Sequence, residues 1–146
     1  MENIKMKYIG ENLAFSKNAG SKARTDIETI LHENYDCLFN IKAMPTSANK
    51  FKNILLKIKY FTQKQNLKNV IELRKIFTDI VILQYPFYFN RIHNHLLKNF
   101  ILNNSVIVFV HDIDSLRHFG RAILEDEIKL LNQAKIVIVH NHYMKG

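Results

Sequence analysis

The sequence contains a single cysteine, Cys37, and no long apolar run. One cysteine excludes an internal disulfide, and its position in the apolar segment YDCLF predicts a buried, inert thiol. No run reaches the roughly 18–20 apolar residues of a membrane span, and residues 1–10 lack the apolar core of a signal peptide. These absences predict a cytoplasmic protein.

Glycine is also scarce, with four residues in the whole chain. Neither the Gly-x-Gly-x-x-Gly pattern of dinucleotide-binding folds nor the P-loop pattern for phosphate binding is present. The sequence therefore argues against an NAD-type dehydrogenase and against a P-loop ATPase. Gly20 lies near a predicted strand-to-helix turn, where the helix N-terminus could bind an anion with Lys22 and Arg24 nearby.

Short runs of apolar, mostly β-branched residues alternate along the chain with helical periodicity. Such runs are typical of strands buried on both faces, and helical connections between them produce a parallel sheet. A length of 146 residues suits one domain with its own core. The sequence therefore predicts an α/β fold, a Rossmann-like doubly wound parallel sheet of about five strands with flanking helices. The predicted strands are residues 5–9, 35–39, 80–83, 106–110 and 136–139. Apolar spacing predicts helices between them, one of which has Ala23, Ile27, Ile30 and Leu31 on a single face. Others are a helix that Ser47 would cap, a short helix near 114–119, and a helix over 124–134 with acidic residues 125–127 in its first turn.

Polar side chains directly follow the last two predicted strands. The fourth strand is followed by His111-Asp112, and the fifth by His140-Asn141. Ligands of open α/β sheets bind beyond the carboxyl ends of the strands, so both pairs are candidates for a functional site. His111 could act as a general base, and Asp112 could orient it or cap the following helix.

The histidines and aspartates also form three short patterns with the spacing of metal-ligand pairs. These patterns are Asp112-x-Asp114, His93-x-His95 and His140-x-His142. Neither a cysteine partner nor a His-Glu-x-x-His helix accompanies them, and three-residue patterns recur by chance. The sequence therefore predicts no metal, with the histidines solvated or capping helices.

The positive charge of the chain is concentrated in one segment. The formal net charge is +8, and residues 42–75 contain nine basic residues against the single acidic residue Glu72, so this segment accounts for all of it. Within it, a predicted helix carries an apolar stripe formed by Phe51, Ile54, Leu55 and Ile58. Four lysines flank this stripe on both sides: Lys50, Lys52, Lys57 and Lys59.

Three interpretations of this basic helix remain open. The helix could pack on the sheet with its lysines at the solvent margins. It could instead lie on an anionic membrane, at the inner face, with its ammonium groups among the lipid headgroups. Nucleic-acid binding is the third, but the segment has few aromatic residues and no known base-reading module. The sequence accordingly predicts no nucleic-acid partner.

Four motifs in order give the chain a resemblance to one family of enzymes. The sequence is similar to the N-terminal half of bacterial GT-B glycosyltransferases. These are the β-1,6-galactofuranosyltransferases and the glucosyltransferases that extend O-linked GlcNAc on serine-rich adhesins. The motifs are NAGSKA at 18–23, ILQYP at 82–86, VHDIDSLR at 110–117, and the group Glu127, Leu131, Asn132, Ile138–Asn141 and Met144.

The resemblance implies two Rossmann-like domains that face each other across a cleft. It makes residues 1–146 the acceptor-side domain, without the C-terminal domain that would hold a UDP-sugar donor, and it implies no metal. The chain alone would then transfer little or no sugar, because donor and acceptor must be held together. The implied catalytic residues are His111 and Asp112, and the implied acceptor-cleft residues are Gly20, Lys22, Gln84, Tyr85, Arg117, His140 and Asn141.

The partners implied are a glycan or glycoprotein acceptor and a C-terminal half or partner transferase subunit. The basic helix adds an anionic membrane surface to these expectations. Two alternatives of a different kind stay open. One is a non-catalytic subunit that binds glycan or docks on a full-length transferase, and the other is a remnant of a truncated gene with an exposed apolar face.

Overall fold

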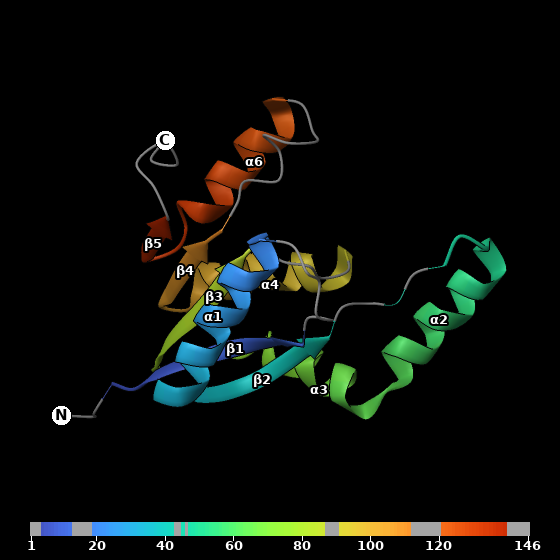
Figure 1. Cartoon of the computed structure of the whole chain (residues 1–146), viewed down its shortest axis with the longest axis horizontal. Helices are drawn as coiled ribbons and strands as arrows, with labels where there is room; N and C mark the ends of the chain where they lie inside the picture. The colour runs from blue at the N-terminus through green and yellow to red at the C-terminus, as the bar shows by residue number, and fades with distance from the viewer. Residues whose placement is uncertain are drawn as a thin grey trace.

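The computed structural model describes residues 4–12, 19–42, 45, 47–86, 91–111 and 121–139. Their centre is a five-stranded, all-parallel sheet in the order β2-β1-β3-β4-β5 (Figure 1). The predicted Rossmann-like α/β class is therefore confirmed. The strands are β1 (Met6–Asn12), β2 (Asp36–Lys42), β3 (Ile80–Tyr85), β4 (Val106–Val110) and β5 (Ile136–Val139). The helices are α1 (Ala19–Asn34), α2 (Lys50–Thr62), α3 (Lys64–Glu72), α4 (Arg91–Asn103) and α6 (Arg121–Leu131).

Helices cover both faces of this sheet. On one face, Val81 of β3 belongs to a buried cluster with Leu97 and Phe100 of α4. On the opposite face, Ile82 belongs to a second cluster with Leu31 of α1. Neighbouring residues of β3 thus point to opposite faces, as the two-residue period of a strand requires. Burial on both sides is the reason that the strand reads as a continuous apolar run.

The spacing of apolar residues in α4 explains how this helix holds the larger cluster. Leu97, Phe100 and Ile101 recur at the i, i+3, i+4 spacing of one helix face, and all three are buried. Truncation of a buried phenylalanine such as Phe100 to alanine typically costs about 3–5 kcal/mol. α4 therefore fixes β3 and β4, the two strands whose carboxyl ends lead to Gln84 and His111.

Three strands extend beyond their predicted ends, and among them β2 reaches Lys42 rather than residue 39. β1 continues through Gly10 to Asn12, and β3 includes Gln84 and Tyr85 before the cis Tyr85–Pro86 peptide bond. Gly10 pairs with Asn40 of β2, and a Cβ atom at position 10 would collide with the Asn40 side chain. Any larger residue at position 10 would have to displace the Asn40 and Glu28 side chains, which explains a glycine inside this strand.

Two helix starts and the environment of the cysteine also differ from expectation. The N-cap of α2 is Asn49, whose side chain accepts from the backbone N–H groups of residues 51 and 52. α6 begins at Arg121, so the acidic residues 125–127 lie beyond its first turn. Cys37 is exposed rather than buried, because it lies near the start of the edge strand β2. The predicted helix at 114–119 lies outside the described residues. Among the described helices, none combines the length and the apolar character that spanning a bilayer demands.

α2 and α3 form an arm, residues 50–72, that follows β2. α3 lies beside β2, whereas α2 extends away from the sheet (Figure 1). Among the residues of α2, all of which are described, Tyr60 alone is buried, and its hydroxyl donates to Lys42 O at 2.7 Å. The interpretation that α2 packs on the sheet is therefore wrong.

Buried asparagines hold this arm in place. Asn66 donates from Nδ2 to Tyr60 O at 2.6 Å, across the corner between the two helices. Asn69 donates from Nδ2 to Asn40 O at 2.8 Å, which joins α3 to β2. Each bond satisfies the buried NH₂ group of its asparagine, and a bond of this kind contributes about 1 kcal/mol net.

Candidate functional site

The strand order creates one place where ligands of such sheets bind. The chain runs from β1 to β2 in one direction and from β3 to β5 in the other, so the order reverses between β1 and β3. Crevices at this reversal, beyond the carboxyl ends of the strands, are the usual binding sites of open α/β folds. Glu11 near the end of β1, Gln84 near the end of β3 and His111 directly after β4 lie at this edge.

Hydrogen bonds connect these side chains through α1. His111 Nε2 lies 2.7 Å from Gln84 Oε1, and Gln84 Nε2 donates to Glu28 Oε2 at 2.7 Å. Glu28 Oε1 accepts from the backbone N–H of Glu11 at 3.2 Å. Arg24 completes the series through a buried ion pair with the Glu11 carboxylate. A continuous polar network, the strand-end network, therefore runs from β4 to β1.

The register of α1 places two charged residues against the sheet. Arg24 and Glu28 alternate with Ile27 and Leu31 at i, i+3, i+4, i+7 spacing, which defines one helix face. Arg24 and Leu31 are buried, and Ile27 and Glu28 are half-buried. The sequence instead assigned Ile30 to this face, and Ile30 is exposed. The face of α1 that meets the sheet is therefore partly charged.

Burial has the largest effect on the pKa values of the Glu11 and Glu28 carboxyl groups. It raises the pKa of Glu11 from its ordinary value to about 7, although Arg24 lowers this pKa through its charge and its hydrogen bond. Burial also raises the pKa of Glu28, against the hydrogen bonds that it accepts from Glu11 N–H and Gln84. A pKa of about 7 lets Glu11 exchange a proton near neutral pH, where an ordinary glutamate is fully ionised.

The network also determines which nitrogen of His111 carries a proton. The Gln84 amide presents its NH₂ group to the Glu28 carboxyl and its carbonyl oxygen to His111. His111 Nε2 must then donate, which makes Nδ1 the proton-accepting nitrogen of the neutral ring. The same Nε2–H donates after Nδ1 gains a proton, so the hydrogen bond persists in both states.

A comparison with known families identifies the fold that carries this network. The family model described as the glucosyltransferase 3-like N-terminal domain matches residues 6–146. The chain belongs to this family. The match confirms the resemblance to the N-terminal domain of a glycosyltransferase that the four motifs indicate. No curated protein sequence matches the chain significantly.

Gln84 and Tyr85, both predicted for the cleft, point to opposite faces of the sheet in the glucosyltransferase 3-like domain. Gln84 points to the α1 face, where it joins the strand-end network. Tyr85 belongs to the cluster on the other face, and its hydroxyl donates to the Glu127 carboxylate of α6, with both side chains buried. Strand geometry, which alternates the faces, keeps these two side chains apart. The structure thus brings His111 and Gln84 together but not Tyr85.

The remaining predicted cleft residues lie either on α1 or outside the described residues. Gly20 lies in the first turn of α1, and Lys22 is exposed on the same helix. The helix begins at Ala19, so Gly20 is not part of a turn before it. Four predicted residues lie outside the described ranges: Asp112, Arg117, His140 and Asn141. Sequence reasoning missed Glu11 and Glu28, although Glu28 stands four residues after Arg24, the spacing that aligns side chains on one helix face.

Metal-ligand groups are not found in the part of the glucosyltransferase 3-like domain that the structure describes. No three His, Cys, Asp or Glu side chains gather there as ligands would. Of the predicted pairs, the side chain of His93 and all four residues of the other two patterns lie outside that part. His95 is exposed on α4.

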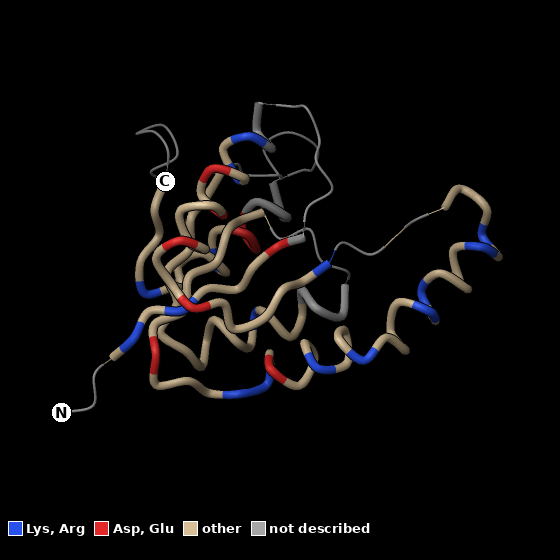
Figure 2. Tube along the Cα trace, turned by 60° about the horizontal axis from the view of Figure 1, so that its bottom comes forward, with Lys and Arg blue, Asp and Glu red and all other residues tan. Residues whose placement is uncertain are grey.

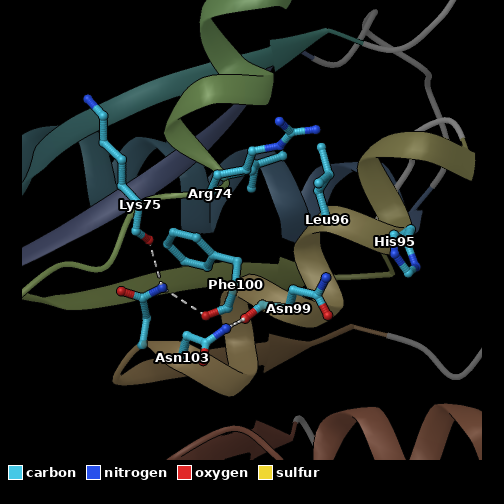
Figure 3. Close-up of a pocket in the computed structure, with 9 residues that line it drawn as sticks. Arg74, Lys75, His95, Leu96, Asn99, Phe100 and Asn103 are labelled. Carbon is cyan, nitrogen blue, oxygen red and sulfur yellow. Dashed lines mark hydrogen bonds between the residues drawn. The ribbon is translucent and has the colours of Figure 1, made fainter.

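A pocket of about 420 Å³ lies elsewhere, between the end of α3 and α4 (Figure 3). Asn104 lines this pocket; its Nδ2 donates to Lys75 O at 3.2 Å and to Phe100 O at 2.9 Å, and its Oδ1 accepts from Phe77 N at 2.6 Å. These bonds attach the segment after α3 to the end of α4. The pocket contains no residue of the strand-end network, so its volume gives no guide to the site.

Proposed function

We propose that this domain forms the acceptor side of a sugar-transfer cleft, in which His111 takes the proton of the acceptor hydroxyl. The observation that carries the proposal is the 2.7 Å hydrogen bond that orients His111 at the carboxyl edge of the sheet. An acceptor hydroxyl must lose its proton as the glycosidic bond forms, and histidine is the side chain most often used for this task. Membership of the glucosyltransferase 3-like family supplies the reaction class.

In the proposed step, the acceptor oxygen attacks the anomeric carbon of the donor sugar. The bond from that carbon to the diphosphate breaks, and its electron pair leaves with the nucleotide diphosphate. The acceptor proton passes to the imidazole of His111. Gln84 and Glu28 act as positioning residues, because they hold the ring with Nε2 directed into the domain. A general base of this kind contributes about 10²–10⁴-fold to the rate.

The donor belongs to the second domain in this proposal. The resemblance assigns the UDP-sugar to a C-terminal Rossmann-like domain across the cleft. We therefore expect the 146-residue chain alone to bind acceptor but to transfer little sugar, because a two-substrate reaction gains its rate from holding both substrates in contact. The glycan or glycoprotein is the partner of the present domain, and no metal takes part in the step.

An NMR titration tests the acceptor role directly. The 146-residue chain is titrated with a GlcNAc-modified serine peptide, the acceptor class that the resemblance implies, and the backbone amide shifts are followed. We expect the shifts of Gln84, His111 and Glu28 to change saturably. Changes confined to α4 around His95, near the pocket there, would overturn the placement of the acceptor site.

Transfer assays test the base role. With this domain joined to its donor-binding domain, His111→Gln should lower kcat by about 10²–10⁴-fold with a smaller change in KM. His95→Gln is the matched control, since His95 is exposed on α4 and outside the network. An unchanged kcat in the His111 variant, with peptide binding lost, would overturn the base role. That outcome would assign His111 to acceptor binding alone.

A further inference from the structure

The apolar stripe of α2 faces away from the protein. On a helical wheel, Phe51, Ile54, Leu55 and Ile58 lie within about 60° of one direction. These four side chains are 74%, 56%, 55% and 56% exposed. The opposite side of the helix, toward the domain, carries the buried Tyr60 and the half-buried residues 53 and 56. α2 therefore reverses the usual arrangement, in which a surface helix turns its apolar stripe to the core.

The lysines of α2 occupy the two sectors between these faces. Lys52 and Lys59 lie on one side of the stripe and Lys50 and Lys57 on the other, each about 80–120° from Phe51 on the wheel. All four are exposed. The helix thus presents an apolar band with ammonium groups along both edges. Figure 2 shows the basic residues spread along α2 and α3.

α3 repeats the reversed arrangement. Its buried residues include the polar side chains Asn66 and Asn69, whereas Leu67 and Ile71 are exposed. Lys64 and Lys68 are exposed on the same helix. Two consecutive helices therefore bury amides and expose aliphatic side chains, and apolar side chains that gather at an exposed surface are typical of an interaction site.

We infer that the outer face of the α2–α3 arm binds an anionic lipid membrane. An apolar stripe bordered by lysines matches a bilayer surface on two counts. The aliphatic side chains enter the boundary between headgroups and acyl chains, while the lysine stems lie along the stripe and carry the ammonium groups to the phosphates. The tyrosine face of α2 points to the domain, so the helix can lie on the membrane without losing its contacts to β2 and α3.

Charge distinguishes the membrane from two other occupants of this face. A second copy of the chain packed symmetrically would bring two sets of four lysines together, and like charges oppose such a contact. A nucleic acid would match the charge but not the stripe, because single-stranded nucleic acids bind through aromatic stacking and the stripe is aliphatic except for Phe51. An anionic bilayer is the occupant that satisfies both features.

Vesicle co-sedimentation tests the inference. The chain is mixed at about 0.1 M salt with phosphatidylcholine vesicles containing about one quarter phosphatidylglycerol, and with pure phosphatidylcholine vesicles. We expect binding to the anionic vesicles only, and we expect it to weaken as salt is raised. Each lysine near such a surface contributes about a fivefold factor, so replacing all four should lower the partition coefficient at least about 100-fold. The variant is Lys50→Gln, Lys52→Gln, Lys57→Gln and Lys59→Gln combined.

A charge-matched control separates location from total charge. This control removes the same four charges elsewhere, through Lys5→Gln, Lys98→Gln, Lys129→Gln and Lys135→Gln, all at exposed positions. We expect it to retain binding within about threefold, because charges more than one Debye length from the surface are screened. Equal losses in both variants would show an attraction governed by net charge alone, and would overturn the inference.

A second pair of variants tests the apolar stripe of α2. Ile54→Ser with Ile58→Ser should lower the partition coefficient about tenfold or more, because both side chains enter the bilayer boundary. Leu102→Ser, at an exposed position of α4, should have no effect. Circular dichroism confirms that each variant stays folded. Unchanged vesicle binding by the Ile variant, or a stripe-dependent dimer in sedimentation equilibrium without vesicle binding, would overturn the membrane assignment.

Discussion

Replacing Arg24 should destabilise the domain by an amount that grows with pH. Arg24 is 2% exposed and Glu11 is 9% exposed, so their ion pair has almost no contact with water. Breaking a buried pair by removing one partner costs about 3–5 kcal/mol, because the other charge stays buried. Arg24→Met keeps most of the side-chain volume and removes the charge.

The pH dependence follows from the pKa of Glu11. With Arg24 in place, this pKa is about 7 in the folded chain against an ordinary value of 4.5, so the folded state binds the extra proton. The contribution of the Glu11 carboxyl to the free energy of unfolding is therefore fully present below about pH 4.5, and it is lost as pH rises toward 7. Without Arg24, the pKa of Glu11 rises further, and the loss continues above pH 7.

Urea unfolding at pH 5.5 and pH 8.5 measures this difference. We expect Arg24→Met to cost about 1–2 kcal/mol at the lower pH, where a neutral carboxyl remains, and about 3–5 kcal/mol at the higher pH. The raised pKa of Glu28 contributes to both proteins, and most of its effect cancels in the comparison. In the double variant with Glu11→Gln, the difference between the two pH values should disappear. A cost that is equal at both pH values in the single variant would refute the reasoning.

Two further substitutions probe other buried polar contacts. Tyr85→Phe removes one donor from the buried Glu127 carboxylate. It should lower the free energy of unfolding, measured in urea titrations, by about 1–3 kcal/mol. A change within experimental error would contradict the buried bond. Asn66→Ala removes the bond to Tyr60 O at the corner between α2 and α3. It should accelerate hydrogen exchange of the α2 amides about tenfold while the sheet amides stay protected. Equal acceleration in the sheet would show that α2 does not open independently of the sheet.

The existence of the strands could be predicted from sequence, but some of their ends could not. Val106–Val110 has no reading other than a buried strand, because five apolar residues are too few for a helix and four of them are β-branched. Gly10 has low strand propensity and Pro86 cannot continue a central ladder, so local reasoning ended the strands before Gly10 and before Gln84. Pairing of Gly10 with Asn40 and of Gln84 with Phe109 keeps these residues in the sheet, and both partners are distant in sequence.

The position of His111 in the candidate site could be predicted from the sequence, but its carboxylate partners could not. His111 follows a strand directly, and parallel strands end at the same edge, so its position could be inferred. The carboxylates that complete the network could not, because they depend on the rotation of α1. Apolar spacing favoured a face with Ile30, whereas the buried pair of Arg24 with Glu11 turns Glu28 toward Gln84. Such a choice is decided by tertiary partners, which a single helix pattern does not contain.

The outward position of the α2 stripe has a consequence for how this sequence changes over generations. Because its four side chains are more than half exposed, polar replacements there are nearly neutral for folding. Random mutation would replace them with polar residues unless selection for a contact retains them. The rate of polar replacement at these positions, set against that at Leu102, would therefore measure selection on the stripe without any binding assay.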